Sequence, residues 1–240
     1  MSSDAAGAAP PDLLPFLAVD GVWQQILRPP AGGDSDRRPA LFLDRDGVIV
    51  EEVGHLRRPG DVRLIPGAAA AISAANRAGV PVVVVSNQSG IGRGLFGWAD
   101  FAAVQERMLA LLAADGAAID AVLACPFHQT AAPPWRHPDH PARKPNPGML
   151  TAAANLLRID LPRSWIVGDR ASDIAAGRNA GLAGGLHVTS GWGSEPGEQA
   201  TAMALAAPRA GFCVLAADGV GAAPVVLPLF PGQEGLPPPR

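Results

Sequence analysis

Short apolar runs alternate with longer segments of helical periodicity through the middle of this chain. The apolar runs predict six strands, at residues 40–43, 81–85, 119–124, 165–167, 185–188 and 212–215. The longer segments predict five helices, at residues 67–78, 99–114, 148–157, 174–180 and 198–206. Two of the runs, 82–85 and 165–167, are apolar on both faces, as expected for strands buried between two helical layers. The pattern therefore predicts an α/β fold, a Rossmann-like three-layer sandwich with a mainly parallel sheet.

The two ends of the chain differ from its middle in proline content. Of 25 prolines, six precede residue 40 and six follow residue 221. We therefore expect a mobile N-terminal extension at 1–38, which includes one short apolar piece, a single domain at 39–221 and a proline-rich tail at 222–240. Two segments inside the domain, 47–66 and 125–146, have no periodicity and are too short for a second domain. We expect no large cap domain, and these two segments should border the site.

Composition and charge exclude several classes of function. Apolar residues make up 48% of the chain and charged residues 17%, which indicates a globular protein. Nineteen basic and 22 acidic residues give a net charge of −3 without any block of like charge, so neither nucleic-acid nor anionic-membrane binding is indicated. Two distant cysteines and the absence of a long apolar run lead us to expect a cytoplasmic protein.

Two acidic side chains follow the first strand of the predicted domain. In Asp44-Arg45-Asp46-Gly47, carboxylates at positions i and i+2 can point to the same side. Two carboxylates this close push their pKa values apart, so that one can act as a nucleophile and the other as an acid. The motif alone also fits a strand that ends in a solvated turn.

Three further motifs carry groups that suit a phosphate or a metal. The strand at 81–85 is followed by Ser86-Asn87-Gln88-Ser89-Gly90, whose backbone N–H groups can converge on an anion. Lys144, the only lysine beside 18 arginines, suggests a need for a compact ammonium. Asp169 and Asp173 follow the strand at 165–167 and can share a hard cation such as Mg²⁺. Each motif alone could be a turn, a solvated cation pair or a helix cap.

Together the motifs indicate one site. In an open α/β sheet, functional groups gather at the carboxyl ends of the strands, and three of these motifs lie at such ends. A metal, a lysine, a hydroxyl group and two unequal carboxylates around a tetrahedral anion are suited to phosphoryl transfer.

The four motifs, at 44–47, 86–90, 143–145 and 168–169, resemble those of the haloacid dehalogenase (HAD) superfamily over about residues 40–190. The residues of these motifs are similar to those of the branch that contains D-glycero-D-manno-heptose bisphosphate phosphatase and histidinol-phosphate phosphatase. The resemblance implies that Asp44 forms an aspartyl-phosphate and that Asp46 protonates the leaving oxygen and then activates water. It further implies that Asp44, the backbone carbonyl of Asp46 and Asp169 hold Mg²⁺, with Asp173 nearby.

The resemblance also implies a set of substrate contacts. Ser86, Asn87 and Lys144 would hold the transferring phosphoryl group, with Gln88 in the same loop. Arg93 and Arg143 are the candidates for contacts beyond that group, including a second phosphate, because a guanidinium fork suits phosphate geometry.

Members of this branch often carry zinc in the loop before the Arg-Lys-Pro motif. At the four corresponding ligand positions this chain has Cys125, Phe127, His140 and Ala142, and two of these cannot bind a metal. An alternative set with tetrahedral potential is Cys125, His128, His137 and His140. A loop rich in proline can also be ordered without metal, so structural zinc is a hypothesis with an open alternative.

These observations lead to the hypothesis of a Mg²⁺-dependent phosphatase, most specifically for D-glycero-D-manno-heptose 1,7-bisphosphate, acting as a monomer. Histidinol phosphate or another small phosphate ester is the alternative substrate. A receiver or binding module that stores phosphate on an aspartate is the alternative from a different class, and an inactive HAD-like protein is disfavoured because all four motifs are intact.

Overall fold

A computed structural model describes residues 9–30 and 37–230 of the chain. Its seven strands form one sheet in the order β1-β4-β3-β2-β5-β6-β7, in which every neighbouring pair is parallel except the antiparallel pair β1 and β4. The strands are β1 (Trp23–Ile26), β2 (Leu41–Leu43), β3 (Val82–Asn87), β4 (Ala121–Cys125), β5 (Trp165–Gly168), β6 (Gly184–Val188) and β7 (Cys213–Ala217). The predicted α/β fold with a mainly parallel sheet is confirmed.

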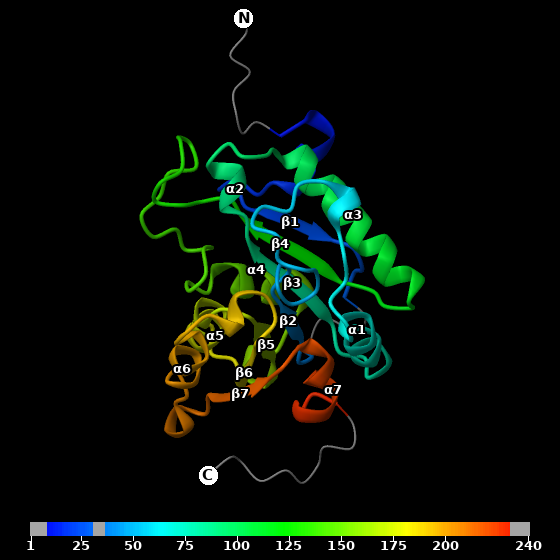
Figure 1. Cartoon of the computed structure of the whole chain (residues 1–240), viewed down its shortest axis with the longest axis vertical. Helices are drawn as coiled ribbons and strands as arrows, with labels where there is room; N and C mark the ends of the chain where they lie inside the picture. The colour runs from blue at the N-terminus through cyan, green and yellow to red at the C-terminus, as the bar shows by residue number, and fades with distance from the viewer. Residues whose placement is uncertain (1–8, 31–36, 231–240) are drawn as a thin grey trace, which may run out of the picture.

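Helices cover both faces of this sheet (Figure 1). On one face lie α1 (Ala68–Arg77), α3 (Trp98–Ala114) and α7 (Ala223–Val226). On the other lie α4 (Gly148–Leu157), α5 (Ala171–Asn179) and α6 (Glu198–Met203), and the short α2 (Ser89–Gly92) follows β3 directly. Within the described residues, no helix is both long and apolar enough to span a membrane.

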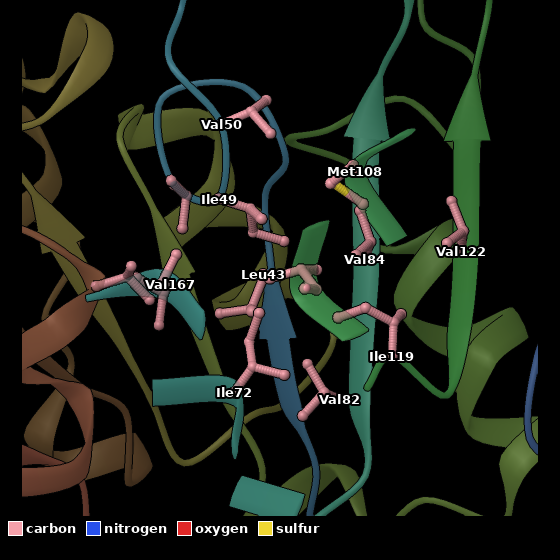
Figure 2. Close-up of a cluster of buried hydrophobic side chains, with 14 of the residues drawn as sticks. Leu43, Ile49, Val50, Ile72, Val82, Val84, Met108, Ile119, Val122 and Val167 are labelled. Carbon is pink, nitrogen blue, oxygen red and sulfur yellow. The ribbon is translucent and has the colours of Figure 1, made fainter. Parts of the chain in front are cut away.

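Alternating side chains along the central strands fill two separate hydrophobic cores. Leu41 and Leu43 of β2 point to the α1/α3 side, where Figure 2 shows Leu43 between Ile72 and the valines of the neighbouring strands. Phe42 points to the α4/α5 side. Because both faces are buried, β2 and the first four residues of β3 are apolar throughout, as their sequence predicts.

Part of the expected N-terminal extension belongs to the fold. Residues 11–16 form a 3₁₀-helix, and β1 pairs with the edge strand β4 from Trp23↔Ala124 to Ile26↔Ala121. Trp23 is only 1% exposed, so the expected mobile segment is wrong for this stretch. At the other end, α7 and the buried Leu227 and Phe230 pack on the core within the expected tail. Residues 1–8, 31–36 and 231–240 lie outside the described residues.

Candidate active site

Three neighbouring strands bring the predicted motifs together. In the order β3-β2-β5, the residues that follow β2 lie between the end of β3, with Ser86, and the end of β5, which Asp169 follows. The backbone N–H of Asp44 donates to the carbonyl of Val167, which extends the β2–β5 pairing to the first carboxylate (3.0 Å). The motifs at 44–46, 86–90, 143–144 and 169–173 line one cavity of about 400 Å³.

Lys144 is the centre of this cavity's charge network. Its ammonium donates to Asp44 Oδ1 (2.7 Å) and to the carbonyl of Val85 (2.8 Å), and it pairs with Asp173 Oδ1 (2.7 Å). These three contacts use all three of its N–H donors. Burial alone would lower the pKa of the ammonium, but the carboxylates of Asp173 and Asp44 outweigh it and raise the pKa above its ordinary value. Lys144 is therefore a fixed cation.

Asp44, Asp169 and Asp173 form a compact carboxylate group. One oxygen from each lies within 4.8 Å of the other two, and the described part of the chain holds no other such group of three acidic, histidine or cysteine residues. Burial raises the pKa of Asp44 to about 7, and the carboxylates of Asp173 and Asp46 add to the effect of burial while Lys144 opposes it. Burial and the carboxylates of Asp44 and Asp173 raise the pKa of Asp169 to about 8. Three carboxylates beside one ammonium suit a hard divalent cation, so the residues fit Mg²⁺.

Two glycines make room for the Asp169 carboxylate. A Cβ at Gly47 or at Gly191 would overlap Asp169 Oδ2, and both glycines have a positive φ (84° and 57°). The same oxygen accepts the backbone N–H of Trp192 (2.8 Å). Gly47 thus matters for close approach, because a side chain there would displace the Asp169 carboxylate.

Asp46 is held by two neighbours in the same cavity. The guanidinium of Arg45 donates to both its carboxylate oxygens, and Gln88 Nε2 donates to Oδ2 (2.9 Å). Gln88 Nε2 also donates to Ser86 Oγ (2.8 Å). Gln88 therefore links the acid of one motif to the hydroxyl of the next.

Both polar groups of the Asn87 side-chain amide bond to the backbone of Lys144. Its Nδ2 donates to the Lys144 carbonyl, and its Oδ1 accepts the Lys144 N–H, each at 3.1 Å. The Asn87 side chain therefore fixes the backbone that carries the lysine.

The two predicted specificity arginines lie in different environments. Arg143 lines the cavity, is half-buried and donates from Nη1 to the carbonyl of Phe127 (3.0 Å). Arg93 is exposed and is not among the residues that line the cavity.

The cavity also contains residues that the sequence did not single out, namely Arg45, Glu52, His55, Arg170 and Trp192. Arg170 lies over the Trp192 ring, with its guanidinium carbon 4.8 Å from the ring centroid. Arg45 stands between the two predicted carboxylates. The others lie in loops, after a strand or, for Trp192, in a short 3₁₀-helix, where no sequence periodicity marks them.

The proposed zinc ligands do not gather. Cys125, His128, His137 and His140 are not within metal-sharing distance of one another, so the expectation of a tetrahedral set is wrong. The Phe127 and His140 rings, at two of the family's ligand positions, stack in parallel with centroids 3.7 Å apart. Burial raises the pKa of the Cys125 thiol to about 11 in the metal-free protein. In this loop, ring stacking joins two of the positions that carry metal ligands in the family.

Local hydrogen bonds also occupy the three histidines. In each, Nδ1 accepts a nearby backbone N–H, from Thr130, Asp139 and Ala142 respectively. These bonds fix the rings in orientations set by the loop itself.

Comparisons with known proteins agree with this geometry. The family model described as HAD-hydrolase-like matches residues 141–212. The D-glycero-beta-D-manno-heptose-1,7-bisphosphate 7-phosphatase of Mesorhizobium japonicum is 46% identical over 81% of this chain and 87% of that protein. The D-glycero-D-manno-heptose-1,7-bisphosphate 7-phosphatase of Thermosynechococcus vestitus is 46% identical over 65% of this chain and 81% of that protein.

A solved structure extends the likeness to the whole fold. The D,D-heptose 1,7-bisphosphate phosphatase of B. bronchiseptica, in complex with magnesium and phosphate, superposes with a TM-score of 0.64 at 30% identity. The alignment covers 77% of this chain and 95% of that one. The resemblance seen in the motifs is confirmed, and the chain belongs to the HAD-like phosphatases, in the branch of the heptose-1,7-bisphosphate 7-phosphatases.

Proposed function

We propose that this protein is a Mg²⁺-dependent phosphatase that removes the 7-phosphate of D-glycero-D-manno-heptose 1,7-bisphosphate. The observation that carries the proposal is the buried group of Asp44, Asp169 and Asp173 around Lys144, in one cavity with a second acid, Asp46. The names of the relatives supply the substrate. Asp44, the backbone carbonyl of Asp46, Asp169 and Asp173 would hold Mg²⁺, which would offset the charge that keeps a carboxylate away from a phosphate.

The chain's own residues divide the reaction into two displacements. An Asp44 oxygen attacks phosphorus while the bond from phosphorus to the sugar oxygen breaks, and Asp46 gives its proton to that oxygen. Water then attacks the aspartyl-phosphate, Asp46 takes the water's proton, and Asp44 is regenerated. The Lys144 ammonium, held beside Asp44, supplies positive charge next to the transferring group, and the Ser86 hydroxyl binds one of its oxygens. Asn87 keeps the Lys144 backbone in place.

The second phosphate of the substrate needs a cation away from the reacting one. Arg143 and Arg170 both line the cavity and present guanidinium groups suited to phosphate oxygens. Arg93 is exposed and lies outside the cavity lining, so we assign the second-phosphate role to Arg143 before Arg93. A monomeric state and a cytoplasmic location remain predictions from the sequence.

Steady-state kinetics across a panel of phosphate esters tests this proposal. We expect the highest kcat/KM for the heptose bisphosphate, with loss of the 7-phosphate and retention of the 1-phosphate seen by phosphorus NMR. A higher kcat/KM for histidinol phosphate would contradict the substrate assignment. Accumulation of phosphoprotein without turnover would instead support a receiver module.

The Asp46→Asn variant separates enzyme from receiver. A module that only accepts phosphate needs no acid for a leaving sugar, so its phosphorylation should survive the change. A phosphatase should lose about 10²-fold or more in turnover of an alkyl phosphate.

A further inference from the structure

Arg45 lies between the two catalytic aspartates and is almost fully buried. Its side chain is 1% exposed, although arginine is among the residues least often found inside a protein. A buried guanidinium is tolerated only where a partner compensates its lost hydration. The identity of that partner shows what the residue does.

The partner is the carboxylate of the next residue, Asp46. Arg45 Nε lies 3.1 Å from both Asp46 oxygens, and Nη2 lies 2.9 Å from Oδ2. Gln88 Nε2 reaches the same Oδ2 from the position between β3 and α2. With donors fixed on two sides, the carboxylate has one orientation within the cavity.

Aromatic packing fixes the guanidinium in turn. Its central carbon lies 5.3 Å from the centroid of the Phe101 ring. Phe101 is itself packed edge to face against Trp23 of β1 (5.3 Å) and Trp98 (5.5 Å). Arg45 Nη1 is buried and has no hydrogen-bond partner among the described residues. The side chain therefore leaves one nitrogen unsatisfied while two nitrogens engage Asp46.

We infer that Arg45 is a positioning residue, whose buried guanidinium on Phe101 holds the Asp46 carboxyl group in the orientation from which it serves the leaving oxygen. The inference rests on the proposed function, because it takes Asp46 as the acid. It also gives the N-terminal strand a part in catalysis, since Trp23 supports the ring on which Arg45 lies.

The test compares two leaving groups in Arg45→Met. An alkyl phosphate releases an alkoxide that needs a proton, whereas p-nitrophenyl phosphate releases a stable anion. We expect kcat/KM to fall about 10²-fold for the alkyl phosphate and by less than about tenfold for the aryl phosphate. Because kcat/KM covers only the steps up to the first irreversible one, slow hydrolysis of the aspartyl-phosphate does not hide the difference.

A double-mutant cycle with Asp46→Asn shows whether Arg45 acts through Asp46. If it does, adding Arg45→Met to Asp46→Asn causes no further loss with the alkyl phosphate. Equal losses for both leaving groups, or independent losses in the cycle, overturn the inference while Asp46→Asn alone still shows the leaving-group effect. If Asp46→Asn shows none, the acid assignment in the proposed function is wrong and the inference falls with it.

Two further variants control for folding. Arg45→Lys keeps a buried cation but loses the fork, and we expect a selective loss of about tenfold with the alkyl phosphate. The exposed Arg77→Met on α1 should leave both kcat/KM values unchanged. Should Arg45→Met fail to fold, Arg45→Lys decides alone, and a loss that is the same for both leaving groups overturns the inference.

Discussion

Two clusters near the same edge of the sheet are built on opposite principles. The carboxylate cluster consists of Asp44, Asp169 and Asp173 around Lys144. The aromatic cluster consists of Phe16, Trp23, Trp98, Phe101, Phe127, Trp135, His137 and His140. In the first, burial raises the pKa values of Asp44 and Asp169, and the charge of the neighbouring Asp173 adds to this effect in both. In the second, neighbouring rings contact one another at centroid distances from 3.7 to 6.3 Å.

This difference shows where the molecule is stable and where it is reactive. The carboxylate cluster keeps its charges close because phosphoryl transfer requires them there, and it needs a cation for balance. The aromatic cluster joins the N-terminal strand, α3 and the loop before Lys144 by packing that needs no metal. Variants in the first should therefore change activity more than stability, unless they leave a charge unpaired, and variants in the second should mainly change stability.

The largest effect is expected for Asp44→Asn. The amide cannot form the acyl phosphate, so kcat should fall by about 10⁴-fold or more. The free energy of unfolding in metal-free buffer at pH 8 should stay the same or rise, because one of the mutually repelling carboxylates is gone. Urea denaturation beside a phosphate-release assay measures both quantities. Retained hydrolysis would show that Asp44 is not the nucleophile.

Lys144→Met should give the largest loss of stability. Removing one partner of a buried ion pair leaves the others uncompensated, which costs about 3–5 kcal/mol. Added Mg²⁺ should recover part of this loss, since a divalent cation can balance the same carboxylates. The midpoint of urea denaturation with and without Mg²⁺ provides the measurement, with exposed Arg77→Met as the matched control. A loss below about 1 kcal/mol would mean that Lys144 does not stabilise the cluster.

The sequence predicted the carboxylate cluster well for a physical reason. Its residues follow buried parallel strands, whose apolar runs are easy to recognise and whose carboxyl ends meet at one edge. All six predicted strands are present within two residues of their predicted starts and ends. Two helix ends move by three residues: α5 starts at Ala171, where Asp173 Oδ2 accepts the Arg170 N–H, and α6 ends at Met203.

The aromatic cluster could not be predicted in the same way. Strand β1 reads Trp-Gln-Gln-Ile, four residues between proline-rich stretches, and its burial depends on pairing with β4 about a hundred residues later. The rings of the loop at 125–146 are brought together by the path of the backbone, and the sequence of this loop has no periodicity from which that path could be predicted. Cysteine and histidine spacing suggested zinc there, whereas stacking between Phe127 and His140 decides the structure.

Trp23→Ala tests whether the N-terminal strand is part of the fold. Trp23 contacts Phe16, Trp98 and Phe101, so its truncation should cost about 3 kcal/mol. Chemical denaturation measures this cost, and Leu14→Ala serves as an exposed control on the same segment. A cost below about 1 kcal/mol would place the strand outside the cooperative unit.

Mg²⁺ should stabilise the protein in a pH-dependent way. In the metal-free protein the pKa values of Asp44 and Asp169 are raised to about 7 and about 8, above their ordinary value of 3.8. Between about pH 4 and pH 8 the folded state therefore binds more protons than the unfolded chain, and the free energy of unfolding falls as pH rises. Mg²⁺ replaces those protons, so its effect should be larger at pH 8 than at pH 6.

The size of this effect follows from mass action. A hundredfold excess of Mg²⁺ over its Kd adds about 2.7 kcal/mol. Thermal denaturation at the two pH values measures the shift in Tm, and Asp169→Asn should remove most of it. An equal shift at pH 6 and pH 8 would contradict the link to these carboxylates.

The smallest effect is expected for Cys125→Ala, and it separates the aromatic loop from a zinc loop most directly. The thiol is buried at the end of β4, and burial favours its neutral form, so alanine should replace it at a cost of about 1 kcal/mol or less with unchanged kcat. A ligand of structural zinc would behave differently, because zinc binding contributes about 10 kcal/mol or more to the folding of small zinc domains. To distinguish a loop held by ring packing from one held by zinc, the denaturation midpoint and the activity are measured before chelation. They are measured again after chelation and readdition of Mg²⁺. Equal midpoints and full recovery of activity are expected, since the four candidate ligands do not gather and the Phe127 and His140 rings stack in the loop before Lys144.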